Sequence, residues 1–141
     1  MHGSIVVGVD GSETAHRAAQ AAARLAAERN ASLHLVTAYG NEKTEVKEIA
    51  GEAWTISNAS EALRIAQRTA ALLAEETGIQ ASAVAEAGKP HEALTREALR
   101  LHAGTIVVGN RGMKGIGRVL GSVANSVAHH APCDVYIVKT D

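Results

Sequence analysis

The residues with the clearest chemical potential form a glycine-rich stretch that follows a short apolar run. The stretch reads Gly109-Asn-Arg-Gly-Met-Lys-Gly-Ile-Gly-Arg-Val-Leu-Gly-Ser122 and carries three cations, Arg111, Lys114 and Arg118. Glycines let a ligand approach the backbone closely, and the N–H groups at the start of a helix attract anions. This stretch therefore predicts a cradle for phosphate groups.

A shorter unit of the same kind lies near the start of the chain. Gly3-Ser-Ile-Val-Val-Gly8 nearly repeats Gly104-Thr-Ile-Val-Val-Gly109, and Asp10-Gly11-Ser12 follows it. If the two apolar runs are neighbouring strands, their ends form one crevice. The Asp10 carboxylate can accept hydrogen bonds from ligand hydroxyls there. Its alternative role is to cap the helix that follows.

The glycine-rich stretch fits neither of the two common phosphate-binding motifs. A P-loop ends in Gly-Lys-Ser/Thr, whereas Gly117 is followed here by Arg118 and Val119. The dinucleotide fingerprint Gly-x-Gly-x-x-Gly fails because, after Gly115 and Gly117, the third glycine comes one position late, at Gly121. The stretch is thus a phosphate-binding candidate of another kind.

Strands and helices that would position these residues alternate along the chain. Strands are expected at 4–9, 33–38, 81–86, 105–109 and 134–139, and helices at 13–29, 60–77, 90–102 and 122–130. The apolar residues of the first strand are contiguous, as in buried parallel strands. The order predicts an α/β fold: an open parallel five-stranded sheet with helices on both faces, formed as a single domain by residues 1–141. Its ligand site is expected where the winding reverses, between the first and fourth strands.

Helix ends follow from single residues. Ser60 and Ser122 are expected to cap the starts of the helices at 60–77 and 122–130, and Asn30 and Gly78 to end those at 13–29 and 60–77. Residues 40–58 carry a mixed run of charges and the only tryptophan. Both a connection with a short helix and a lid over the crevice fit this segment.

Composition limits the classes of function. The formal net charge is −1, with no Phe, one Trp and two Tyr, which argues against a nucleic-acid partner because neither a basic field nor stacking platforms are available. No apolar stretch approaches the ~20 residues that span a bilayer, and the N-terminal residues lack the basic segment of a signal peptide. The single cysteine, Cys133, fits a reducing compartment. A cytoplasmic location is therefore expected.

Histidines give no sign of a metal or catalytic centre. His129 and His130 are adjacent on a predicted helix, so their side chains point about 100° apart and cannot chelate one metal ion as an i, i+4 pair does. His16, His91 and His102 are isolated helix positions. No Ser-His-Asp order or His/Cys cluster indicates catalysis.

Two further patterns are Gly109-x-x-Gly112, followed by a spacer and Gly121-Ser122, and Val9-Asp10-Gly11-Ser12. Together they resemble the nucleotide-binding subgroup of the universal stress protein family. The resemblance covers nearly the whole chain, including Gly88-x-Pro90 and the closing Pro132-Cys-Asp-Val-Tyr-Ile-Val138. The spacer from Met113 to Leu120 has eight residues, one fewer than is usual in the family. A triphosphate and a smaller phosphate, as in cyclic AMP, are therefore alternative occupants.

The resemblance implies a Rossmann-like fold of the adenine nucleotide alpha hydrolase type and a set of site residues. Asp10 would face the ribose, Val36 would meet adenine through its backbone, and Gly109 would lie under the ribose. The phosphates would be lined by Gly112, Gly121, Ser122 and Val123, and a divalent cation would accompany them. Apart from the resemblance, Arg111 is a candidate for phosphate contact by its charge, its alternative being a solvated loop cation.

The function implied is that of a cytosolic, stress-related regulatory protein that binds ATP or a related adenine nucleotide. Two alternatives stay open: a slow nucleotide hydrolase or nucleotidyl-transfer enzyme with at most weak ATPase activity, and an interaction module with an empty pocket. The apolar strand 134–139 is expected at a sheet edge, where it invites pairing with another chain. The resemblance implies a homodimer through this strand, and the lack of a long apolar stretch argues against a membrane partner. The alternative is an edge blunted by Asp134 and Lys139. Proline at Val138 would probe the pairing.

Overall fold

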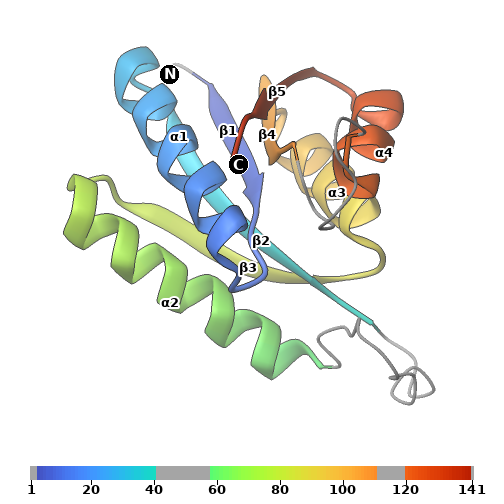
Figure 1. Cartoon of the computed structure of the whole chain (residues 1–141), viewed down its shortest axis with the longest axis horizontal. Helices are drawn as coiled ribbons and strands as arrows, with labels where there is room; N and C mark the ends of the chain where they lie inside the picture. The colour runs from blue at the N-terminus through green and yellow to red at the C-terminus, as the bar shows by residue number, and fades with distance from the viewer. Residues whose placement is uncertain (1–2, 41–57, 111–119, 141) are drawn as a thin grey trace.

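A computed structural model describes residues 3–40, 58–110 and 120–140 of the chain. Five parallel strands form one sheet in the order β3-β2-β1-β4-β5 (Figure 1). The strands are β1 (Ser4–Gly8), β2 (Ser32–Tyr39), β3 (Ala81–Ala87), β4 (Thr105–Gly109) and β5 (Asp134–Val138). The helices are α1 (Glu13–Arg29), α2 (Ala59–Thr77), α3 (Pro90–Leu101) and α4 (Ser122–His130). The alternating order and the parallel sheet are as the sequence predicts.

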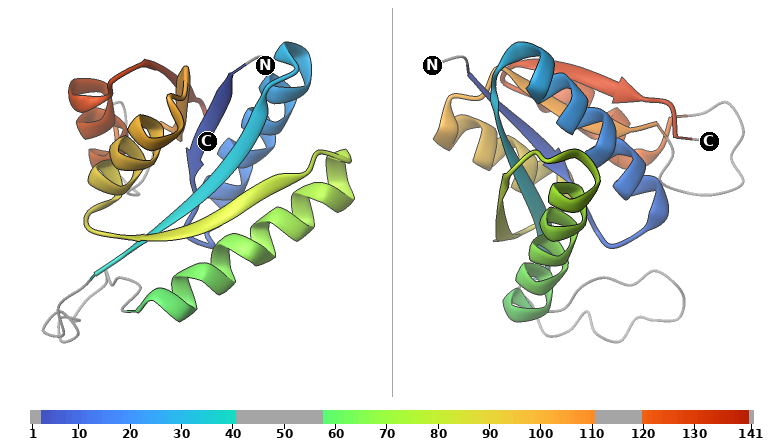
Figure 2. Two further views of the ribbon diagram at one scale, coloured as in Figure 1. Left: turned by 180° about the vertical axis from the view of Figure 1, so that it is seen from behind. Right: turned by 90° about the vertical axis from the view of Figure 1, so that its left-hand side faces the viewer.

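Helices cover both faces of the sheet (Figure 2). One core joins β1 residues such as Ile5 and Val7 to the buried alanines of α1 and to Leu73 of α2. The other joins Val6 of β1 and Ile106 of β4 to α3 and α4. Because alternate side chains of a strand point to opposite faces, a contiguous run such as Ile5-Val6-Val7 contributes to both cores. This explains why the central strands are apolar throughout.

Two of the predicted helix ends are confirmed. Asn30 and Gly78 adopt left-handed conformations with φ of 57° and 78° at the ends of α1 and α2. Their backbone N–H groups donate to carbonyls in the last turn of their helices, which otherwise lack partners.

The helices expected at 13–29 and 122–130 begin where the sequence predicts, but three capping residues differ by one or two positions from those considered. Ser12, not Asp10, caps α1, because its Oγ accepts from the N–H of Ala15 at 3.2 Å. Asn58 replaces Ser60 as the cap of α2, since an extended backbone at Asn58 brings its amide oxygen 2.8 Å from the N–H of Glu61. The residue before α4 is Gly121, which leaves Ser122 as the first helical residue. In each case a neighbouring polar or glycine residue was equally suitable by type, and backbone geometry decided between them.

The final strand lies at the edge of the sheet beside β4, as predicted. It ends at Val138, one residue short of the expected 134–139. Among the helices that the structure describes, none has the length and apolar character needed to cross a membrane.

Candidate functional site

A crevice of about 220 Å³ opens at the carboxyl ends of β1, β2 and β4. Its floor is mainly apolar, with Leu94 of α3 and Ala124 of α4 among the lining residues. Polar side chains line it in the turn after β1, at Asp10 and Ser12, and in the first turn of α1, at Thr14. β1 and β4 are neighbours in the sheet although they are far apart in sequence, so the winding reverses between them. This is the position at which open α/β sheets bind ligands.

The structure brings four of the predicted site residues together in this crevice: Asp10, Val36, Gly109 and Val123. Gly121 and Ser122 come just before Val123 in the chain but are not among the lining residues. Arg111 and Gly112 lie outside the described residues. So do residues 41–57, which make up most of the candidate lid at 40–58.

Asp10 has one carboxylate oxygen engaged and one available. Oδ1 accepts from the backbone N–H of Ser12 at 2.9 Å, which shapes the turn into α1. Oδ2 has no hydrogen-bond partner among the described residues, and the side chain is exposed at the crevice. A carboxylate oxygen can accept two hydrogen bonds, so Asp10 is able to accept from a pair of ligand hydroxyls without losing its structural bond.

The backbone at the end of β2 offers open polar groups at Ala38 rather than at Val36. The carbonyl of Val36 accepts from the N–H of Val9 at 2.9 Å, and the pairing of β1 with β2 ends there. The backbone N–H and C=O of a strand residue point to the same side of the strand, so those of Val36 face β1. The backbone groups of Ala38, two residues further along, face the same side. β1 has ended at that point, and Ala38 lines the crevice. A planar ligand edge can therefore hydrogen-bond to Ala38.

Gly8 also lines the crevice, although the motifs in the sequence do not single it out. A Cβ at this position would lie 3.2 Å from Cδ1 of Leu94. The signal was present in the near repeat of 3–8 and 104–109, where Gly8 and Gly109 end the two central strands. A glycine at the end of a buried strand often marks close approach by a ligand.

At its amino end, α4 presents backbone amides that have no partner within the helix. The N–H of Asn125 donates to the carbonyl of Gly121 at 3.0 Å, which is the first bond of the helix. The N–H groups of Ser122, Val123 and Ala124 precede it and have no partner within the helix. The N–H of Gly121 itself donates to the carbonyl of Asn110 at 2.9 Å. Three amides beside the crevice are thus placed to meet a negative charge.

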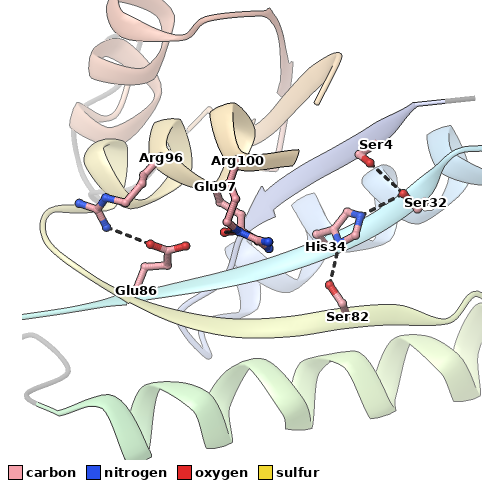
Figure 3. Close-up of polar contacts among 8 residues, drawn as sticks. All are labelled: Ser4, Ser32, His34, Ser82, Glu86, Arg96, Glu97 and Arg100. Carbon is pink, nitrogen blue, oxygen red and sulfur yellow. Dashed lines mark hydrogen bonds and ion pairs between the residues drawn. The ribbon is translucent and has the colours of Figure 1, made fainter. Parts of the chain in front are cut away.

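α3, which forms one wall of the crevice, is tied to the sheet by charged residues (Figure 3). Glu97 has a side chain only 1% exposed and accepts from Arg100 at 2.6 and 3.0 Å. Glu86 of β3 pairs with Arg96 at 2.9 Å and shares a hydrogen bond with Glu97. The Arg100 hydrogen bond lowers the pKa of Glu97, whereas burial, followed by the contact with Glu97, raises the pKa of Glu86.

These opposite shifts predict a pH-dependent stability. When folding raises the pKa of a carboxyl group, that group lowers the free energy of unfolding as the pH rises. The loss occurs between the pKa of the group in the unfolded chain and its pKa in the folded protein. Glu86→Gln removes this penalty and keeps a donor for Glu97. We therefore expect the variant to gain stability relative to the wild type as the pH rises through this interval, and to hold that gain at neutral pH. Urea unfolding from pH 4 to 7.5 measures the difference, and a difference that is constant with pH would contradict the assignment.

Next to this cluster, His34 is a neutral bridge between hydroxyl groups. Its Nε2 lies 2.9 Å from Ser32 Oγ, and its Nδ1 lies 2.7 Å from Ser82 Oγ (Figure 3). Burial lowers the pKa of His34, although Glu97 opposes this shift. One ring nitrogen can donate and the other accept, which suits the neutral imidazole. We therefore assign His34 a structural role.

The other histidines are placed by the fold in ways that the sequence does not reveal. His91 of α3 contacts His130 of α4, with ring centroids 5.1 Å apart. His16 bonds Glu76 across α1 and α2 at 3.0 Å. Among the described residues, no group of three or more His, Cys, Asp or Glu side chains is arranged to hold a metal ion.

Comparison with known proteins gives a consistent result. The sequence model of the universal stress protein family matches residues 1–139. A universal stress protein from the QAH/OAS sulfhydrylase 3′ region of Thermus aquaticus is 33% identical, over 99% of this chain and 100% of its own length. Rv1636, a universal stress protein of Mycobacterium tuberculosis, is 34% identical over 97% of this chain and 96% of its own.

Solved structures agree in fold. A universal stress protein in complex with cAMP superposes with a TM-score of 0.76 and 31% identity, covering 99% of this chain and 98% of that one. The universal stress protein from Archaeoglobus fulgidus in complex with dAMP superposes with a TM-score of 0.69 and 24% identity, covering 99% of this chain and 100% of its own.

Proposed function

This chain belongs to the universal stress protein family, and from that premise we propose that it binds an adenine nucleotide in the crevice between β1 and β4. The observation that carries the proposal is the convergence of three kinds of recognition group on one apolar crevice. Ala38 supplies backbone groups for the edge of adenine, and Asp10 supplies a carboxylate oxygen for ribose hydroxyls. The first amides of α4 supply donors for phosphate.

Two solved relatives support the choice of ligand. One, 31% identical, was solved with cAMP, and a more distant one with dAMP. We propose that ATP, AMP and cyclic AMP compete for this crevice. Because the spacer has eight residues, a monophosphate or cyclic phosphate is the better fit to the short phosphate-binding segment. Gly112, Gly121 and Ser122 belong to the proposed phosphate site together with Arg111, and a divalent cation would accompany a triphosphate.

We further propose a regulatory role in the cytoplasm, in which nucleotide occupancy rather than turnover is the output. Isothermal calorimetry with ATP, ADP, AMP and cyclic AMP tests binding, and mass spectrometry of ligand released from the purified protein identifies the natural occupant. No heat from any of the four, with folded protein, would support the empty interaction module instead. Release of ADP or phosphate from ATP, lost when Asp10 is replaced, would support the hydrolase.

The substitution Asp10→Asn tests the ribose contact without disturbing the turn. Asn Oδ1 can still accept from the N–H of Ser12, so the entry to α1 is kept. A hydrogen bond to a charged acceptor contributes roughly 1 kcal/mol more than one to a neutral acceptor, so AMP affinity should fall about fivefold. Asp134→Asn, at the amino end of β5, is the matched control and should bind AMP like the wild type. Equal affinities for the wild type and Asp10→Asn would remove Asp10 from the site.

We propose a homodimer through β5, the apolar edge strand. Tyr136 on this strand is 46% exposed. The structure changes how the pairing should be probed. The carbonyl of Val138 accepts from the N–H of Asn110 at 2.8 Å, so the polar groups of Val138 face β4. Proline there would break the sheet inside one subunit. The outward polar groups belong to Val135 and Ile137, but both side chains pack against the core of α3 and α4. The exposed Tyr136 is therefore the better position.

A further inference from the structure

Asn110 joins the two ends of the glycine-rich segment. It is the last described residue before 111–119, and Gly121 lies just beyond that interval. The N–H of Gly121 donates to the carbonyl of Asn110 at 2.9 Å. The end of β4 and the start of α4 are thereby held together by a direct backbone hydrogen bond.

The side chain of Asn110 fixes the same point to the C-terminal part of the chain. Its Oδ1 accepts from both the backbone N–H and the Oγ1 of Thr140, at 2.8 and 3.1 Å. Thr140 is only 3% exposed. Its carbonyl accepts from Nη1 of Arg17 in α1 at 2.8 Å. Asn110 therefore connects four elements: β4, α4, the residues after β5, and α1.

Thr140 also packs directly against the crevice glycine of β4. A Cβ at Gly109 would lie 3.1 Å from Cγ2 of Thr140, so no side chain fits between them without displacement. Gly109 lines the crevice. Thr140, Asn110 and Gly109 thus form one packed unit at the carboxyl end of β4.

We propose that Asn110 is a positioning residue for the phosphate group of the ligand. This inference rests on the proposed function and adds a residue to it. Asn110 acts through the amides of Ser122, Val123 and Ala124, because its bond to Gly121 sets where α4 begins. Anion binding by a helix start depends on where those amides point. Loss of the Asn110 side chain would remove its two bonds to Thr140 and loosen this arrangement, while the adenine and ribose contacts at Ala38 and Asp10 would be unaffected.

The test compares AMP with adenosine, which lacks the phosphate. Asn110→Ala removes two hydrogen bonds that hold Thr140, and we expect AMP affinity to fall about tenfold while adenosine affinity stays within about twofold. Thr140→Val removes only the hydroxyl donor and should give a smaller loss with the same selectivity. Asn125→Ala is the control: it removes an exposed asparagine side chain from α4 itself and should leave the AMP-to-adenosine ratio unchanged.

The outcomes separate this inference from the proposed function. If the wild type binds neither ligand, the proposed function fails and the inference fails with it. If the wild type binds both, and Asn110→Ala weakens both equally or neither, then the proposed function stands and the positioning role is wrong. Thermal unfolding confirms that each variant is folded. Should Asn110→Ala not fold, Thr140→Val decides: a selective loss for AMP supports the role, and an unchanged ratio overturns it.

Discussion

Gly8→Val is expected to abolish measurable binding of adenine nucleotides, with an affinity loss of about 100-fold or more. A Cβ at Gly8 would lie 3.2 Å from Cδ1 of Leu94, which is closer than about nine in ten contacts that real Cβ atoms make. The two methyl groups of valine would then occupy the floor of the crevice, since both Gly8 and Leu94 line it. Overpacking of this kind costs roughly 1–3 kcal/mol of stability, so the variant should remain folded with a lower melting temperature.

Gly104→Val is the matched control for this substitution. Gly104 begins the other near repeat, at the end of β4 opposite to the crevice, and a Cβ there would meet nothing within 4 Å. Calorimetry with AMP should show wild-type affinity for Gly104→Val and no binding for Gly8→Val, with circular dichroism confirming both folds. Wild-type affinity in a folded Gly8→Val variant would place the nucleotide outside this crevice.

Tyr136→Glu is expected to convert the proposed dimer to a monomer at micromolar concentration. Tyr136 lies in the middle of β5 and is 46% exposed, so a charge can be added without disturbing the core. A two-fold pairing of β5 with its copy brings the two introduced carboxylates close together, and like charges on paired strands are destabilising. The dissociation constant should rise at least about tenfold, because apolar contact is also lost.

Light scattering over a range of concentrations measures this change. Tyr136→Phe keeps the ring and should remain dimeric. Leu72→Glu places the same charge at a leucine of similar exposure, 42%, on α2, and should also remain dimeric. A wild-type monomer would reject the dimer itself, and a Tyr136→Glu dimer of unchanged affinity would move the interface away from β5.

Site residues could be predicted from the sequence only where the residues that identify them lie close together in the chain. Asp10 and Gly109 could be identified because a polar or glycine residue after a buried apolar run marks the end of a strand, and parallel strands end at one edge. Ala38 could not be identified, because its open backbone groups exist only where β1 stops short of β2. The alignment of two strands is a property of register, and no residue type at position 38 records it. Asn110 could not be identified either, because its partners Gly121 and Thr140 lie 11 and 30 positions away in the sequence.

The sequence by itself determined the order of strands and helices, the parallel sheet and the family. Hydrophobic periodicity, glycine stops and the spacing of glycines are carried by residues close together in the chain. Tertiary structure alone decided which polar groups are still available to a ligand. Examples are the engaged carbonyl of Val36, the Asn110–Thr140 contact and the pairing of Glu86 with Glu97. Hydrogen bonding is satisfied across elements that are distant in sequence, so the groups that remain open are known only once every element has found its neighbours.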